Sequence, residues 1–327
     1  MQTFAFFKII CTFTSRYFLN IYLIITIMKK ILLLFAMVGQ VLTAQQINVQ
    51  SISFLKNSEV GGYYHPAFSP SGDYLLTTSE NYTGLRQYNF ADNFVKVLTT
   101  DPGAGYGVQI SADGNTIVYK KTQYINRLRN NSLVSLSRVT GKQVQLAAPT
   151  REPITAGFSA NKPQYVKGNK LFRVNIMTPD VAPVVCIENQ KIVLYTGSMR
   201  KVLTPNGESA SYIWPSISPD KKNIAYTVAG KGTFVCRIDG TNPKSLGKLN
   251  APVWINNEWL VGMDDKDDGE KLLSSSLVVL SIDGKARQTL NTPKEVMAMY
   301  PAASPDGSQI AFNTEKGELY LVKIQIK

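Results

Sequence analysis

The sequence predicts an all-β fold, a β-propeller of six four-stranded antiparallel blades. Two observations support it: one short phrase recurs along the chain, and an apolar run follows each copy. The clear copies are residues 66–72, 108–114, 215–221 and 301–307. A strand, a tight turn and a second strand that repeat about every 40–50 residues are typical of propeller blades.

The phrase is well suited to a hairpin turn. In the last copy Pro305 presets φ, Asp306 can hydrogen-bond its own backbone, and Gly307 tolerates a positive φ. The runs that follow the copies are rich in β-branched and aromatic residues, as strands between two sheets require. A second turn recurs at residues 139–141, 238–240 and 282–284. Two hairpins per repeat predict four strands per blade.

Two degenerate copies complete the predicted count. Residues 156–160 and 251–255 resemble the phrase without its turn, which makes six blades. The third repeat is irregular, with extra chain around residues 178–195. A seventh blade within this irregular region is the alternative count.

The two ends of the repeat region predict how the ring closes. The last copy ends after residues 317–324, which supply only its third strand. Residues 47–54 alternate as a strand does, so we expect them to pair with the last blade as its outer strand. Such pairing leaves no exposed sheet edge.

The phrases at 68–72 and 303–307 resemble the repeats of TolB-like six-bladed propellers, a branch of the WD-type propeller repeats. The resemblance covers nearly all of residues 45–327; its four clear copies make it specific for the fold and not for a function. The family's namesake carries an α/β domain before its propeller. Here the repeats start within about twenty residues of the expected mature terminus, so the resemblance is to a free-standing propeller.

The N-terminus predicts export. Residues 28–44 combine two lysines, an apolar run and Thr43-Ala44, the three parts of a secretory signal peptide. We interpret residues 1–27 as a mis-assigned extension; a two-part membrane anchor is the alternative, although the apolar stretch 17–27 is short for a bilayer. Cleavage after Ala44 leaves one propeller domain, residues 45–327, without a stable transmembrane anchor. We expect a periplasmic or cell-surface protein.

The charge balance does not predict a nucleic-acid partner. The formal net charge of +12 falls to +8 without residues 1–44, which carry four basic residues and no acidic ones. The basic residues are scattered, and the closest clusters, Arg127/Arg129 and Arg200/Lys201, are too small for a nucleic-acid stripe. We expect a monomeric propeller with a solvated basic surface.

The residue inventory argues against an enzyme. His65 is the single histidine, which excludes a histidine-based metal cluster and leaves one candidate for a Ser-His-Asp arrangement. The sequence has no G-x-S-x-G elbow and no phosphate-binding or dinucleotide glycine loop. We therefore expect no catalytic residues and no cofactor. Cys186 and Cys236 either form a disulfide in an exported protein or are free core residues.

An acidic run at residues 264–270 is a weak calcium candidate. Its possible ligands are Asp264, Asp265, Asp267 and Asp268. Clustered carboxylates in a loop can hold calcium. Against the register of an EF-hand, however, Lys266 occupies a ligand position and Ser275 replaces the closing glutamate. A solvated hairpin loop is the favoured interpretation.

Aromatic residues gather where several blades begin. The residue immediately before the strand-opening position is His65, Gly107, Trp214 or Tyr300 in the clear copies and Thr155 in a degenerate one, with further tyrosines beside them. These positions follow the loops that enter the innermost strands, so they should surround one mouth of the central channel. The predicted binding residues are Tyr64, His65, Tyr106, Trp214 and Tyr300. The alternative is that they plug the channel and hold adjacent blades together.

The leading functional hypothesis is a non-catalytic module that docks an envelope protein or peptide on these aromatic residues. Binding of a glycan or another small ligand in the channel is the first alternative. A lyase that uses a carboxylate and a tyrosine in the channel comes last, because the aromatic positions contain no acid and the chain has a single histidine.

Overall fold

The computed structural model describes residues 47–56, 61–175 and 182–326. These residues fall in one compact unit, Gln46–Lys327, and none of them is helical. The described part of the chain accordingly contains no helix with the length and hydropathy to cross a membrane. The expected signal peptide and N-terminal extension, residues 1–44, lie outside the described residues.

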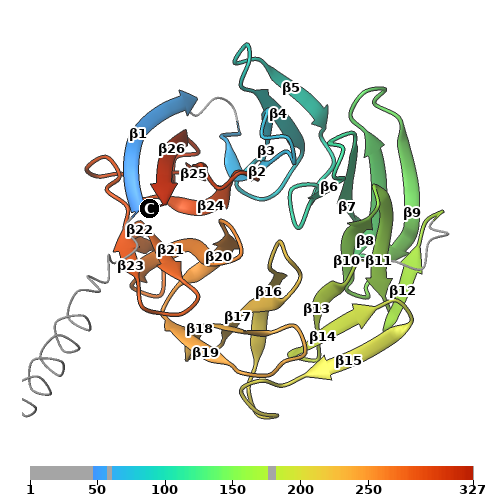
Figure 1. The fold of residues 1–327 in the computed structure, drawn as a ribbon. Coiled ribbons are helices and arrows are strands. Elements are labelled where there is room, and N and C mark those ends of the chain that lie inside the picture. Colours follow the sequence, from blue (N-terminus) through green and yellow to red (C-terminus); the bar gives the residue numbers. More distant parts are fainter. Residues whose placement is uncertain (1–46, 57–60, 176–181, 327) are drawn as a thin grey trace, which may run out of the picture. The chain divides into compact units, whose positions relative to one another are not determined.

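Seven antiparallel sheets form the fold, and Figure 1 shows them as blades around a common centre. Blade 1 consists of β2 (Tyr64–Phe68), β3 (Tyr74–Thr78), β4 (Leu85–Asn89) and β5 (Val95–Thr99). Blade 2 consists of β6 (Gln109–Ile110), β7 (Thr116–Ile125), β8 (Leu128–Ser137) and β9 (Gln143–Thr150). Blade 3 consists of β10 (Ile154–Ser159), β11 (Lys162–Lys167) and β12 (Lys170–Arg173).

Blade 4 consists of β13 (Val184–Glu188), β14 (Lys191–Thr196) and β15 (Met199–Leu203). Blade 5 consists of β16 (Tyr212–Ile217), β17 (Asn223–Val228), β18 (Gly232–Arg237) and β19 (Lys244–Gly247). Blade 6 consists of β20 (Asn250–Trp254), β21 (Trp259–Asp267), β22 (Leu272–Ser281) and β23 (Arg287–Thr289). Blade 7 consists of β24 (Met299–Ala303), β25 (Gln309–Asn313), β26 (Leu319–Ile326) and β1 (Ile47–Lys56).

The predicted count of six blades is wrong, whereas five of the seven sheets have the predicted four strands among the described residues. The stretch interpreted as one irregular repeat holds two sheets, blades 3 and 4, each with three described strands. Their first hairpins turn through pairs of residues with positive φ, Ala160-Asn161 and Asn189-Gln190. Such two-residue turns need no Ser-Pro-Asp-Gly phrase. The phrase is therefore absent from blades 3 and 4, which is why the prediction counted one blade where the structure has two.

Ring closure occurs as predicted. Strand β1 pairs antiparallel with β26, from Ile47 opposite Ile326 to Lys56 opposite Leu319. Ile47 is 2% exposed and belongs to the same core cluster as Phe312 and Val322. The N-terminal strand thus covers the last blade with both backbone pairing and apolar contact.

A buried serine in each clear copy of the recurring phrase forms hydrogen bonds that stabilise the turn. The hydroxyl of Ser304 donates to Asp306 Oδ1 at 2.5 Å and accepts the backbone N–H of Gln309 at 2.9 Å. The same arrangement holds for Ser111 with Asp113 and for Ser218 with Asp220. The serine closes the hairpin from inside, where an unpaired hydroxyl would be costly.

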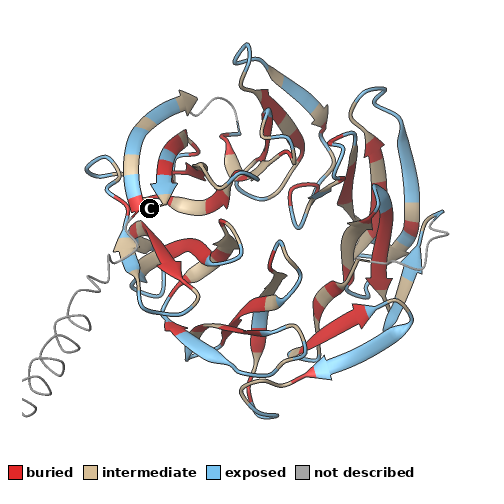
Figure 2. Cartoon of the chain, in the orientation of Figure 1, coloured by how far each residue is buried: buried red, intermediate tan, exposed pale blue. Residues whose placement is uncertain are grey.

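The core lies between adjacent blades. Figure 2 shows buried residues along the middle strands and exposed residues along outer strands such as β9 and β15. Trp259 and Phe312, 1% and 0% exposed, pack in one cluster between blades 6 and 7. Since outer strands face solvent and middle strands are packed, the loops at the ends of the blades are the places where a site can form.

Candidate functional site

A repeated backbone bulge sets the aromatic side chains in place. His65, Trp214 and Tyr300 have φ values of 50°, 51° and 49°, the left-handed region that side chains other than glycine rarely adopt. Each lies at a register shift between the first two strands of its blade. A proline follows each one, and proline has no N–H to leave unpaired at the bulge. Bulges of this kind re-aim a side chain, and strained residues cluster at functional sites.

The aromatic side chains form a continuous row. The His65 ring stacks on Tyr82 with 4.2 Å between the ring centroids, and its centroid lies 4.1 Å from that of Tyr300. Tyr82 in turn meets Tyr106 edge-on at 5.3 Å. We call Tyr64, His65, Tyr82, Tyr106, Trp214 and Tyr300 the aromatic mouth.

The five predicted residues divide into two groups. Tyr106 and Trp214, 53% and 50% exposed, line a large cavity. Tyr64, His65 and Tyr300 are half-buried and continue the row away from it. The hydroxyl of Tyr64 donates to the carbonyl of Glu315 at 3.2 Å, which ties blade 1 to blade 7. Tyr64, His65, Tyr106 and Tyr300 thus belong to one row of rings. Trp214 lines the same cavity as Tyr106 but has no ring contact with the row among the described residues.

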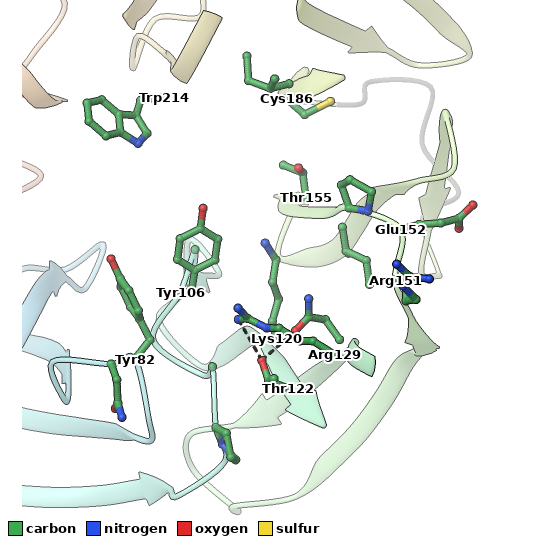
Figure 3. A pocket seen from close by; sticks show the side chains of 18 of the residues that line it. Tyr82, Tyr106, Lys120, Thr122, Arg129, Arg151, Glu152, Thr155, Cys186 and Trp214 are labelled. Atoms are coloured by element: carbon green, nitrogen blue, oxygen red, sulfur yellow. Dashed lines mark hydrogen bonds between the residues drawn. The ribbon is translucent and has the colours of Figure 1, made fainter. Parts of the chain in front are cut away.

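The cavity has a volume of about 1150 Å³ and is bordered by loops and strands of blades 1 to 5. Figure 3 shows Tyr82, Tyr106 and Trp214 on one side of it, Arg151 and Glu152 on the other, and Lys120 between them. This volume exceeds the roughly 300–1,000 Å³ of most small-molecule pockets. An extended segment with several side chains fits such a space.

Tyr82 is a member of the row that the sequence prediction missed. It lies in the turn between β3 and β4, with a φ of 61°. Strands alternate in direction within a blade, so this turn reaches the same face as the loop before β2. The same parity places the turn between β7 and β8 on this face, together with Arg129 at the start of β8. The order of the strands could have revealed both residues.

His65 is a packed, neutral ring. Burial lowers its pKa from 6.5 to about 4, and a hydrogen bond with the backbone of Glu80 only partly opposes this. Its backbone N–H donates to Asn313 Oδ1 at 3.0 Å. A histidine with such a pKa is uncharged at neutral pH and holds the row together by stacking.

Lys120 is the cation nearest the row. Its Nζ lies 4.8 Å from the centroid of the Tyr106 ring. Burial lowers the pKa of Lys120, and the charge of Arg129 lowers it further. Arg129 and Arg151 line the same cavity. The cavity therefore combines exposed aromatic faces with three basic side chains.

The carboxylates of the acidic run bind groups of their own blade, blade 6. Asp264 pairs with Arg287 at 3.3 Å, and Asp265 Oδ1 accepts a hydrogen bond from Asn250 at 2.6 Å. The carboxylates of Asp267 and Asp268 accept backbone N–H groups of the following turn. Within the described ranges no three His, Cys, Asp or Glu side chains are grouped to hold a metal ion.

The two cysteines are free and buried in different core clusters. Burial raises the pKa of each thiol to about 12. Neither is therefore a thiolate at neutral pH, although Cys186 borders the cavity.

Comparisons with known proteins support the fold. The chain is similar to the solved structure of a putative TolB from Agrobacterium tumefaciens, with 18% identity, a TM-score of 0.51, and coverage of 81% of this chain and 90% of that one. It is also similar to TolB from Acinetobacter baumannii, with 15% identity, a TM-score of 0.50 and coverage of 79% of this chain. This chain spans only 57% of the length of that second protein.

A further solved structure, oligogalacturonate lyase from Vibrio parahaemolyticus, matches with 12% identity and a TM-score of 0.46 over 82% of this chain and 79% of that one. No family model and no curated protein matches the sequence. The TolB structures agree with the predicted resemblance to TolB-like propellers at the level of the fold, with seven blades here.

Proposed function

We propose that this chain is an exported, non-catalytic binding module that docks a segment of a partner protein on its aromatic mouth. The observation that carries the proposal is the set of strained bulges that hold His65, Trp214 and Tyr300 at one end of the ring. Ala251 in blade 6 has the same bulge, with a φ of 47°, so the bulge belongs to the repeat, and the aromatic side chains on the other three bulges are what this end of the ring presents. Trp214 among them is 50% exposed. Exposed aromatic side chains on a rigid frame are typical anchors of protein interfaces.

Export rests on the signal-like pattern of residues 28–44, and the fold of the TolB structures is compatible with it. We infer a place in the cell envelope from the same two observations. The partner is expected to be a protein or peptide of that compartment.

Affinity capture from native envelope extract tests the proposal. The baits are residues 45–327 of the wild type and of a Tyr106→Ala/Trp214→Ala double variant. We expect at least one protein that the wild type retains and the double variant loses, because both rings line the cavity. Interface aromatic residues typically contribute about 2 kcal/mol or more each, so the combined loss should exceed about a hundredfold in affinity.

A matched control is available on the outer strand β15. Met199 and Val202 are 69% and 45% exposed there, far from the cavity lining. A Met199→Ala/Val202→Ala variant should retain the same protein as the wild type. Equal capture by all three baits would show that the aromatic mouth does not dock the partner.

A glycan is the second candidate, favoured by one observation. Thr122 and Asn131 line the cavity, hydrogen-bonded to each other at 2.8 Å, near the exposed ring of Tyr106. Sugars need such polar groups beside an aromatic face. Saturable binding of an oligosaccharide that the double variant loses, without any captured protein, would favour this candidate.

A further inference from the structure

Within the described residues, the ammonium group of Lys120 has no counterion. It extends from β7 into the cavity beside Tyr106 and Arg129 (Figure 3). No described carboxylate lies within 4.0 Å of it and no described group accepts a hydrogen bond from it, whereas its neighbour Lys121 pairs with Asp101 at 2.8 Å. The side chain is half-buried, and removing a charge even partly from water without a partner costs free energy. An anion that enters the cavity would therefore meet a cation without a competing partner.

Two further cations border the same space. Arg129 is exposed and reaches Thr122 Oγ1 through one long contact of 3.5 Å. Arg151 is exposed in the loop that joins β9 of blade 2 to β10 of blade 3. The neighbouring Glu152 is the one carboxylate in the described cavity lining, and it forms no ion pair within the described residues. The side of the cavity on blades 2 and 3 is therefore net positive.

Beyond the row, on blades 6, 7 and 1, the charges are mixed. Asp265 Oδ1 accepts a hydrogen bond from Asn250 at 2.6 Å, and the Lys248 ammonium donates to the backbone carbonyl of Asp265. Arg86 donates to the carbonyl of Gly62 and lies 5.6 Å from the centroid of the Tyr63 ring. The cations of the cavity on blades 2 and 3 are therefore the charges of this face that an anionic ligand can reach from the cavity.

We propose that the segment docked on the aromatic mouth carries an aspartate or glutamate whose carboxylate binds Lys120, with Arg129 and Arg151 beside it. This inference rests on the proposed function and specifies the partner's chemistry. A peptide suits the site better than an acidic saccharide. A peptide can present an acidic side chain to Lys120 and apolar side chains to the exposed rings of Tyr106 and Trp214, whereas an acidic saccharide has no side chains for these anchors.

Selection from a phage-displayed library of random dodecapeptides tests the inference without a known partner. The targets are residues 45–327 of the wild type, Lys120→Met, Lys120→Arg and Lys142→Met. Methionine keeps much of the lysine stem and removes a poorly solvated charge, so the fold should tolerate it. Lys142 is exposed in the turn between β8 and β9, on the opposite face by strand parity, and is the matched control.

We expect acidic residues to be enriched in the pools from wild type, Lys120→Arg and Lys142→Met, and not in the pool from Lys120→Met. A selected peptide should lose about tenfold or more in affinity when its acidic residue is changed to the amide, or when Lys120→Met is the target. Binding of that peptide should weaken as salt is added.

Two results would overturn the inference in different ways. Pools without acidic enrichment, whose peptides bind the wild type but not the Tyr106→Ala/Trp214→Ala double variant, would contradict the charge assignment and leave the docking function standing. A library that yields no peptide above background, while tri-galacturonate binds and is lost with Lys120→Met, would overturn both and assign the cations to an acidic saccharide.

Discussion

Replacing Trp259 with alanine is expected to lower the free energy of unfolding by about 3–5 kcal/mol. Trp259 is 1% exposed in the cluster that joins blades 6 and 7, where Ile310 and Val322 also pack. Blade 7 closes the ring through β1, so a cavity there weakens the seam between the chain ends. Urea unfolding followed by circular dichroism measures the loss.

Trp214 provides the matched control for this prediction. It is 50% exposed, so Trp214→Ala should change stability by no more than about 0.5 kcal/mol. Its φ of 51° favours glycine, and Trp214→Gly should be about 1 kcal/mol more stable than Trp214→Ala. If Trp214→Ala were as destabilising as Trp259→Ala, the aromatic mouth would be part of the core rather than a surface kept for binding.

His65 should make the protein less stable as the pH falls below neutrality. Its pKa is about 4 in the folded protein and 6.5 when exposed, so the unfolded chain takes up the proton first. The contribution is fully present above about pH 6.5 and is lost as the pH falls toward 4. Between about pH 7 and pH 5 the expected loss is about 2 kcal/mol, in a range where most carboxylates stay ionised.

The His65→Phe variant isolates this effect, because phenylalanine keeps a ring between Tyr82 and Tyr300 without the titrating group. Its stability should be flatter over the same pH range. The chain has one histidine, so in protein free of any polyhistidine tag its imidazole signals can be followed by NMR. A midpoint near 6.5 would mean that the ring is open to solvent and able to exchange protons at neutral pH.

The sequence predicted most of the fold because its hairpins have a chemical signature. The serine of each clear copy, such as Ser304, is buried and holds the turn through its own hydrogen bonds, so the phrase marks a blade wherever it occurs. Blades 3 and 4 use two-residue turns with positive φ, which asparagine, glutamine and alanine supply here without a phrase. Because these turns lack the recurring phrase, the two blades were predicted as one, and six blades were counted instead of seven.

Only part of the site was predicted, because the sequence reveals residues that share a position in the repeat and not residues that the strand directions bring to the same face. His65, Trp214 and Tyr300 share one position in the repeats of three blades, so their gathering at one face follows from the fold alone. Tyr82 and Lys120 lie at other positions, in a turn and along β7, and only the strand directions bring them to the same face. The bulges that aim the rings are a backbone property that residue types alone do not reveal.

The central claim is that a partner protein contacts the aromatic mouth, and site-specific photocrosslinking tests it most directly. Benzoylphenylalanine would replace Trp214 in one protein and Met199, on the outer strand β15, in another; both native side chains are exposed. We predict a crosslinked protein from position 214 in intact cells, lost when Tyr106→Ala is added, and none of the same size from position 199. Equal crosslinking from both positions, or from position 199 alone, would contradict the account.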